Sequence, residues 1–292
     1  MTGAFVATGT RALVMIAADT LTVQAGGSID VSSKITGGSR KGAAANTGTC
    51  STLTRGGSDS GGGGGGAGGS FADVAGHGGI GDTNNTAPPN GSAAGAPVGT
   101  AQATPTILRG GCPGSAGGDG STDQNKAGGA GGDGGGAVYL IAYNTITISG
   151  TVFGSGAAGG ATAGRNGAEQ GGGGGGSGGM IGLDAPTINV SGMIVANGGG
   201  GGGGGSIDDG GGPAGDGTTT NWNVRASNGL GDQNSKGNGG DGAKGTTINM
   251  ASGVDGSNSV GGGGGGGGSL GVVWTWGTLT PGAMISPAPV TH

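Results

Sequence analysis

The stretch Gly134–Gly156, GGGAVYLIAYNTITISGTVFGSG, contains the unit from which this chain is built. It opens on glycines, runs through the apolar block Val138–Ala142, and then alternates apolar and polar residues over Thr145–Ile148. Alternation with a period of two, rich in β-branched residues and bounded by glycine, is typical of β-strands joined by tight turns. The stretch therefore predicts two or more short strands in succession.

The same pattern recurs elsewhere in the chain. Full copies occupy Leu13–Ser33 and Met180–Asn197, and partial copies occupy Thr246–Asn258, which keeps the second half, and Ser269–Leu279, which keeps the first. No window shows a capped helical periodicity, and the copies are unevenly spaced. We therefore expect an all-β, non-helical fold, a solenoid-like stack of short strands with insertions of variable length.

Glycine is the most unusual feature of the composition, at 88 of 292 residues. Runs such as Gly198–Gly205 and Gly261–Gly268 lack the every-third-residue glycine pattern that a collagen triple helix requires. Glycine loses more backbone entropy on ordering than any other residue, and its amide and carbonyl groups still need partners. We expect the runs to form packed polyglycine-II helices that leave the strand stack as excursions and hydrogen-bond to one another.

The predicted organisation is a single domain with two short terminal segments. Residues 1–12 form an N-terminal arm, 13–279 form one glycine-rich β/polyglycine-II repeat domain, and 280–292 form an extended, proline-containing C-terminal tail. Asn84–Thr106 and Ile207–Asn234 are rich in polar and turn-forming residues and are predicted to be irregular surface loops.

Charge excludes several classes of partner. Charged residues make up 9% of the chain and the formal net charge is −5, which is too little positive charge for nucleic-acid binding.

No apolar run of the sequence is long enough for a transmembrane helix. Arg11 and the following ALVMIAA resemble a short signal-peptide core, but their match to the block at Val138 favours a strand. The numbered chain thus carries no convincing export signal.

No group of residues predicts catalysis, a cofactor or a metal. His77 and His292 are the only histidines, and neither lies in a Ser/His/Asp or Cys/His pattern. The GxGxxG patterns have no strand–helix context. Asp208-Asp209 and Asp216 are better explained as solvated loop carboxylates than as cation ligands. We expect a protein that is not an enzyme and has no cofactor, catalytic residue or metal site.

Cys50 and Cys112 are the only cysteines, and they bracket an irregular segment. In an extracellular protein they predict a disulfide worth about 4 kcal/mol by the loop-entropy estimate, and the alternative is two unrelated thiols. The sequons at Asn84 and Asn90 leave open whether the chain is glycosylated.

Aromatic residues are scarce, so their positions carry information. Tyr139 and Tyr143 fall on one face of a predicted strand, as do Trp274 and Trp276. One interpretation is ordinary core packing, and the other is an exposed aromatic row that contacts another subunit or a receptor. The candidates for such an assembly interface are Leu270, Val272, Trp274, Trp276, Tyr139 and Tyr143.

Several glycine-rich segments of the sequence resemble those of known proteins. GGGGGGAGGSF, GGGAVYLIAYNTITISGTV, GGGGGGSGGMIGLDAPTINVSG and VANGGGGGGGG resemble a glycine-rich class of secreted or surface proteins of bacteria, over most of the chain from Gly61 onward. The expected glycine helices are also distantly similar to the tip adhesins of T-even-type phage tail fibres, and to the glycine-rich antifreeze proteins of springtails. The first resemblance implies a surface protein without an assigned activity, and the second implies loops displayed on a polyglycine-II core.

The expected function is structural. Low charge and dense backbone pairing suit a subunit that polymerises with copies of itself into an extracellular or cell-surface fibre, or forms part of a phage virion. The alternatives are an adhesin that binds a cell-surface receptor or glycan through its loops, and an ice-binding protein.

Overall fold

The computed structural model describes residues 1–292 apart from 48–49, 60, 82–106, 121–126, 163–168, 207–209, 218–220, 232–236, 245–251, 257–260 and 281. The sequons at Asn84 and Asn90 and the loop Asn84–Thr106 therefore lie outside the described residues. The same holds for most of the first half of Thr246–Asn258 and for parts of Ile207–Asn234.

The described residues form two β-sheets in which every strand pair is parallel, and they contain no helix. The five-stranded sheet has the order β1-β4-β7-β9-β11. The seven-stranded sheet has the order β12-β10-β8-β5-β2, with β3 and β6 paired beside it. The strands are β1 (Ala4–Val6), β2 (Leu13–Ala17), β3 (Thr20–Val23), β4 (Ser28–Asp30), β5 (Ala137–Ala142), β6 (Thr145–Ile148), β7 (Thr151–Phe153), β8 (Met180–Val190), β9 (Met193–Val195), β10 (Val272–Leu279), β11 (Met284–Ser286) and β12 (Val290–Thr291).

Equivalent positions of the sequence units lie beside one another in register. Thr20 pairs with Thr145, which in turn pairs with Thr187. One strand earlier in each unit, Leu13 pairs with Val138, which pairs with Ile181. The repeated pattern in the sequence therefore specifies which strands are neighbours.

The expected fold class, an all-β, solenoid-like stack of short strands with polyglycine-II excursions, is wrong as an architecture. β8 runs unbroken through eleven residues and pairs with both β5 and β6. β10 follows it along its length. Because these long strands bridge the first two strands of each unit, those strands merge into one seven-stranded sheet, and the third strands form the separate five-stranded sheet. The fold is two parallel sheets rather than a stack of short-stranded coils.

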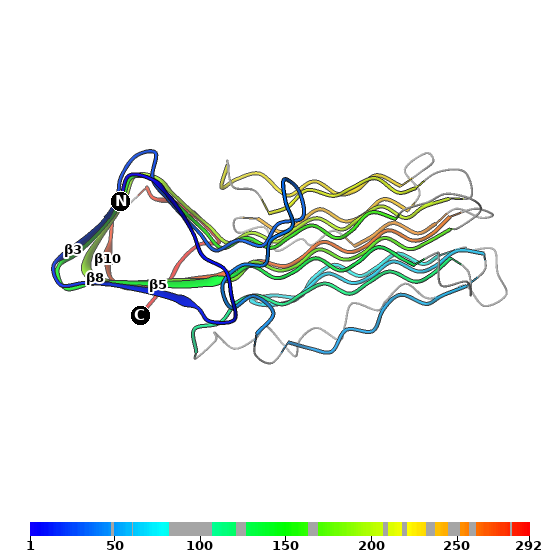
Figure 1. Cartoon of the computed structure of the whole chain (residues 1–292), viewed down its shortest axis with the longest axis horizontal. Helices are drawn as coiled ribbons and strands as arrows, with labels where there is room; N and C mark the ends of the chain where they lie inside the picture. Colours follow the sequence, from blue (N-terminus) through cyan, green and yellow to red (C-terminus); the bar gives the residue numbers. More distant parts are fainter. Residues whose placement is uncertain are drawn as a thin grey trace.

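The hydrophobic core lies between the two sheets, within the roughly triangular outline that the strands enclose at one end of the molecule (Figure 1). Inward-facing residues alternate with outward-facing ones along each strand, as the period-two pattern requires. The largest side chains of this core have no exposed surface, and they are Ile29, Leu140, Ile146, Ile148, Ile181, Leu183, Ile188 and Ile194.

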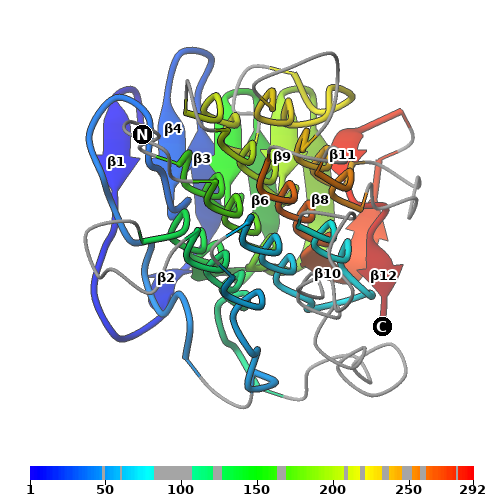
Figure 2. The ribbon, with the colours of Figure 1, turned by 90° about the vertical axis from the view of Figure 1, so that its right-hand side faces the viewer.

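Glycine-rich segments make the crossovers that parallel strands need. Parallel strands cannot be joined by a tight turn, and α-helices usually make the connection. Here the chain leaves the strands, runs along the glycine-rich body and returns, so that many such segments lie side by side (Figure 1). Viewed from the end of this body, the segments are small coils arranged in adjacent rows (Figure 2).

Backbone hydrogen bonds hold the glycine-rich segments together with a period of three residues. The segment 171–179 shows the pattern, because successive amides donate to three different neighbouring segments in turn. Every third amide donates to the same neighbour at 2.7–3.1 Å: Gly171, Gly174 and Ser177 to Gly118, Ser115 and Cys112; Gly172, Gly175 and Gly178 to Gly263, Gly266 and Ser269; Gly173, Gly176 and Gly179 to Gly160, Ala157 and Gly154. Three residues per turn is the period of a polyproline-II-type helix.

Steric packing explains why these positions are glycine. A Cβ atom built on Gly174 would lie 1.9 Å from the carbonyl oxygen of Ala67, and one on Gly201 would lie 2.1 Å from that of Gly265. Real Cβ atoms essentially never come within 3.0 Å of such an atom. Neighbouring segments therefore approach backbone to backbone, which is the close approach that a bare glycine permits.

Both terminal segments contribute strands to the sheets. β1, in the segment 1–12, pairs in parallel with β4. In the segment 280–292, β11 pairs with β9 and β12 pairs with β10. The two termini lie at the strand-built end of the molecule, away from the far end of the glycine-rich body (Figure 1).

Candidate functional site

Exposed apolar side chains gather on the two strands at one edge of the sheets. β1 is the outermost strand of the five-stranded sheet and β2 ends the main path of the seven-stranded sheet. On β1 Val6 is 49% exposed, and on β2 Val14 and Ile16 are 49% and 75% exposed. β2 and the adjoining β1 lie along the same side of the molecule, in dark blue (Figure 2). We call β1, β2 and β3 together the first-unit edge.

The first-unit edge lacks the devices that usually protect an open sheet edge. Its three strands have the sequences AFV, LVMIA and TLTV, with no charged residue and no proline. Natural proteins shield edges with charge, proline, bulges or a covering segment, because free backbone groups invite pairing with another chain. Among the described residues, no strand pairs with the outer side of any of the three, and only Met1 exchanges backbone hydrogen bonds with Thr22 and Gln24 at the end of β3. The inward-facing Leu13 and Met15 are only partly buried and pack against the core, so the core itself reaches this edge.

The opposite edge is different in kind. β12 covers β10 at Trp274 and Thr275, and Pro287 and Pro289 lie between β11 and β12. Proline cannot donate a ladder hydrogen bond, so it discourages strand addition. The two edges of the strand-built end are therefore unlike, one open and apolar and the other protected.

An aromatic cluster occupies the outer face of the seven-stranded sheet near this protected edge. The Trp274 and Trp276 rings meet edge to face at 5.3 Å and 90°, and Tyr139 meets Trp276 at 5.7 Å and 83°. The ring of His292 stacks on Trp276 at 5.0 Å and 19°, and it meets Trp274 edge to face at 5.6 Å. We call these four residues the aromatic cluster.

The interface candidates selected from the sequence differ in their exposure and position in the structure. Leu270, Val272 and Trp274 are buried, with 6–7% exposure, and so they are not available to a partner on this surface. Tyr139 and Trp276 are partly exposed and lie together in the aromatic cluster. Tyr143 is 75% exposed in the turn after β5 and has no place in the cluster.

Asp184 joins the aromatic cluster, and the sequence did not single it out. The Tyr139 hydroxyl donates to Asp184 Oδ2 at 3.1 Å, and Asp184 pairs in register with Trp276. Burial, together with the nearby carboxylate and this hydrogen bond, raises the pKa of Tyr139 to about 12. The tyrosine ring lies against the backbone of Gly182, where a Cβ would meet ring carbon Cδ2 at 2.1 Å. Asp184 is the one charged residue of β8 and lies on an outward-facing position, which is the signal that could have identified it.

The disulfide predicted from the sequence is present between Cys50 and Cys112. It packs in a second hydrophobic cluster with Phe71, Met180 and Trp274. The Arg109 guanidinium donates to both sulfurs at 3.2 Å and lies 5.1 Å from the centre of the Phe71 ring. Burial lowers the pKa of Arg109 from its usual value. The disulfide and Phe71 thus belong to a cap over the outer face at the start of β10.

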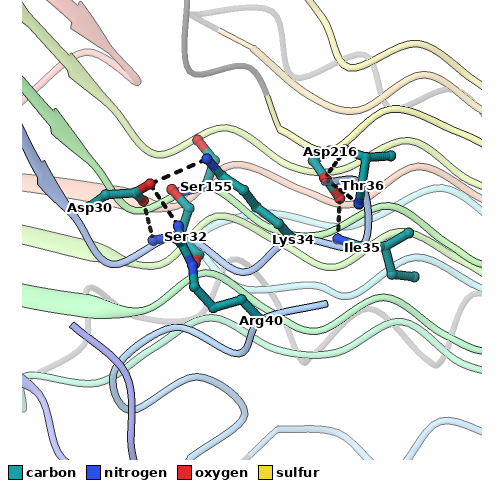
Figure 3. A network of polar contacts seen from close by, with 8 residues as sticks. All are labelled: Asp30, Ser32, Lys34, Ile35, Thr36, Arg40, Ser155 and Asp216. Carbon is teal, nitrogen blue, oxygen red and sulfur yellow. Dashed lines mark hydrogen bonds and ion pairs between the residues drawn. The ribbon is translucent and has the colours of Figure 1, made fainter. Parts of the chain in front are cut away.

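A polar network joins the strands to the glycine-rich body (Figure 3). Asp30, at the end of β4, forms ion pairs with Arg40 at 2.6 Å and Lys34 at 3.2 Å, and it accepts from the Ser32 amide at 2.9 Å. The Ser32 hydroxyl accepts from the Ser155 amide at 3.1 Å. This network lies where β4 and β7 give way to glycine-rich chain, and it satisfies backbone groups that no longer have a strand partner.

Asp216 performs a similar task farther along the body (Figure 3). Its carboxylate accepts from the amides of Ile35 and Ala158 at 2.9 Å and of Thr36 at 3.0 Å. The carboxylate thereby ties together three segments that are distant in sequence. Its role here is structural.

We expect the Asp30 network to make stability depend on pH. Burial alone raises the pKa of Asp30, but the hydrogen bond from Arg40, the Ser32 amide and the charge of Lys34 outweigh it and lower the pKa. A carboxyl whose pKa is lower in the folded state stabilises the fold fully above its unfolded value of about 3.9, and this contribution is lost as pH falls through the folded value. The free energy of unfolding should therefore decline below about pH 4.

The matched variant for this prediction is Asp30→Asn. It should lower the free energy of unfolding at pH 7 and flatten its decline below about pH 4, because the group that titrates there is gone. Urea unfolding at several pH values measures both effects. An unchanged slope in the variant would assign the acid sensitivity to other carboxyls.

A cleft of about 490 Å³ lies between the segment after β1 and the loop before the disulfide. Thr8, Thr10, Ser39, Lys41 and Asn46 are among the residues that line it. Asn46 has φ 59°, and its side chain accepts from the Gly134 amide at 2.8 Å, which holds this unfavourable backbone in place. The walls of the cleft are more apolar than polar, and Arg40 and Lys41 both line it, an arrangement that specifies no particular chemistry.

The described residues contain no group of three or more His, Cys, Asp and Glu side chains that could hold a metal ion. Asp208-Asp209 lies outside them. Within the same residues, no helix is long and apolar enough to cross a membrane. Comparisons of the chain with protein-family models, with curated proteins and with solved structures found no match, so the geometry described above is the basis for assigning a function.

Proposed function

We propose that this protein is a non-catalytic structural subunit of a fibre outside the cell, and that it docks onto a neighbouring subunit through its first-unit edge. The observation that carries the proposal is that the exposed apolar side chains of the strands coincide with an edge that has no charge and no proline. Val14 and Ile16 are 49% and 75% exposed there, beside unpaired β-strand backbone.

Two physical terms favour docking at this edge. Covering apolar surface contributes about 25 cal/mol per Å² removed from water. An added strand also satisfies the free amide and carbonyl groups of β2, the mode of recognition known as β-augmentation. Leu13 and Met15 are partly exposed because no strand lies beyond β2, and an added strand would bury them fully.

The favoured partner is another copy of this chain. Its own strands repeat the side-chain pattern that β2 and β3 already accept from β5 and β6, so a like strand would fit in register. A contact between two different surfaces of the same molecule propagates into a filament when its rotation does not close a ring. The glycine-rich body stands away from the docking edge and offers an inert, hydrogen-bonded rod (Figure 1).

The protected edge supports a second candidate, in which the protein is the terminal adhesin of a fibre. Proline beside β11 and β12 disfavours addition of a further copy there, so growth would stop after one subunit. The first-unit edge would then dock onto a fibre made of another protein. This arrangement agrees with the resemblance to phage tail-fibre tip adhesins and leaves the other surfaces for a receptor.

The docking proposal predicts that Ile16→Lys weakens association at least about tenfold, because a lysine ammonium would be buried without a partner. Ile16 is 75% exposed, so the subunit itself should keep its melting temperature. Leu230→Lys is the matched control, since Leu230 is 65% exposed on the glycine-rich body. Light scattering over a concentration series measures the change.

The outcomes separate the proposals. If the parent protein associates and only Ile16→Lys loses association, the docking edge and self-assembly both hold. A parent that stays monomeric at high concentration contradicts the homopolymer and leaves the terminal adhesin as the function. Equal loss in both lysine variants would contradict docking at this edge.

A further inference from the structure

The aromatic cluster shows that one face of Trp276 accepts a flat ring. The His292 imidazole stacks on it at 5.0 Å with planes 19° apart, while His292 itself is exposed. Trp276 belongs to the middle of β10, held by β8 on one side, so its position does not depend on the last residues of the chain. The stacked imidazole therefore occupies a preformed aromatic surface.

The other rings make this surface rigid. Trp274 stands at 90° to Trp276 and is 7% exposed, and Tyr139 meets Trp276 edge to face at 83°. The Tyr139 ring in turn lies on the bare backbone of Gly182, a position where only glycine fits. Rigid aromatic anchors lose little conformational entropy on binding.

One polar side chain borders the surface. Asp184 is partly exposed, is aligned with Trp276 across the β8–β10 pair, and accepts the Tyr139 hydroxyl through one of its oxygens. A carboxylate accepts several hydrogen bonds, so it retains capacity for more donors.

We propose that the face of Trp276 on which His292 stacks, with Asp184 beside it, binds a pyranose ring of a carbohydrate, and that the His292 side chain covers this site when it is empty. A pyranose has a flat face of C–H groups that packs on an indole and a rim of hydroxyls that both donate and accept. Asp184 accepts from two such hydroxyls. An aromatic surface with a polar group placed beside it is a usual composition of a small-molecule site.

Parallel stacking favours a sugar over a cation. A quaternary ammonium is held by aromatic faces on several sides, whereas here Trp276 takes a ring in parallel stacking, and Tyr139 and Trp274 stand nearly perpendicular to it. Trp276, on β10, is separated from β2 by β8 and β5, whereas Tyr139 of the aromatic cluster lies beside Val14 of the first-unit edge. The stacking face of Trp276 does not require the docking proposal, and it is available in a fibre subunit as in a terminal adhesin.

The test uses the full chain and immobilised oligosaccharides of glucose, galactose and N-acetylglucosamine, with tryptophan fluorescence as a second readout. Trp276→Ala should weaken binding about tenfold or more, and Trp276→Phe should restore part of it because a ring face remains. Trp222→Ala is the matched control, since Trp222 is also partly exposed but lies in the glycine-rich body. Equal melting temperatures of Trp276→Phe and the parent exclude a folding defect.

His292→Ala gives a change of the opposite sign. Removing the imidazole that covers Trp276 should tighten oligosaccharide binding severalfold, since the sugar no longer competes with a stacked side chain. The inference is overturned if neither the parent nor His292→Ala retains any oligosaccharide, or if Trp276→Ala and Trp222→Ala bind alike. If choline quenches the fluorescence of Trp276 and no oligosaccharide does, the site binds cations, and the carbohydrate inference is overturned.

Discussion

Gly201→Ala is expected to lower the free energy of unfolding by about 3 kcal/mol or more, a large loss for a change of one methyl group. The added Cβ would lie 2.1 Å from the carbonyl oxygen of Gly265, in a neighbouring segment. The Gly201 amide and carbonyl are themselves bonded to Gly240 and Gly229 at 2.8 Å, so the backbone cannot move aside without breaking those bonds. Overpacking against backbone has no flexible side chain to absorb it.

Gly3→Ala is the matched control for this substitution. Neither glycine has a positive φ, so alanine strains neither backbone. A Cβ on Gly3 meets nothing within 4 Å. The substitution should therefore be neutral or stabilise by a few tenths of a kcal/mol, through lower entropy of the unfolded chain. Denaturant unfolding of both variants measures the difference, and similar stabilities would refute close backbone packing as the reason for glycine at position 201.

Loss of the disulfide should have the next largest effect. The Cys50→Ala/Cys112→Ala variant removes a bridge that closes 62 residues and is expected to lower the free energy of unfolding by about 4 kcal/mol. The closed loop contains long glycine-rich stretches, which have the most conformational entropy to lose on folding. The variant also loses the sulfurs that contact Arg109 and cover Phe71, so the cap over β10 should loosen.

Reductant provides the control for the disulfide. It should lower the melting temperature of the parent toward that of the double variant and leave the double variant unchanged. Mass measurement of the non-reduced parent should give a value two hydrogens below the reduced form. Two free thiols in the non-reduced parent, or equal melting temperatures of parent and variant, would contradict this prediction.

The sequence predicted neighbouring strands better than their assembly into sheets. Thr20, Thr145 and Thr187 mark equivalent positions of the repeated unit, and the structure places them in register. Whether the strands of one unit stay separate depends on their ends, and β8 continues without a break through Pro186 where earlier units turn. Because β8 is continuous, the expected coils merge into a seven-stranded sheet. No local sequence pattern predicts this continuity.

The candidate surfaces were only partly visible in the sequence. The aromatic residues of β5 and β10 could be selected by their rarity, but not their separation into buried Trp274 and partly exposed Trp276. That separation depends on Phe71 and the disulfide, which cover the start of β10 from a distant part of the chain. Val14 and Ile16 belong to a continuous apolar run, which is typical of a strand buried on both faces. Their exposure follows from β2 being at the edge of its sheet.

By itself the sequence determined the properties that depend on local pattern: strands with a period of two, the absence of helical periodicity, the pairing of equivalent units, and glycine runs whose backbone groups must find partners in one another. These follow from the residues and their near neighbours. The tertiary structure alone decided that the strands form two parallel sheets, that one edge is open and apolar, and that His292 lies on Trp276 beside Asp184. Such features depend on which segments, far apart in sequence, are brought together, and the free energy of those contacts exists only once the chain has folded.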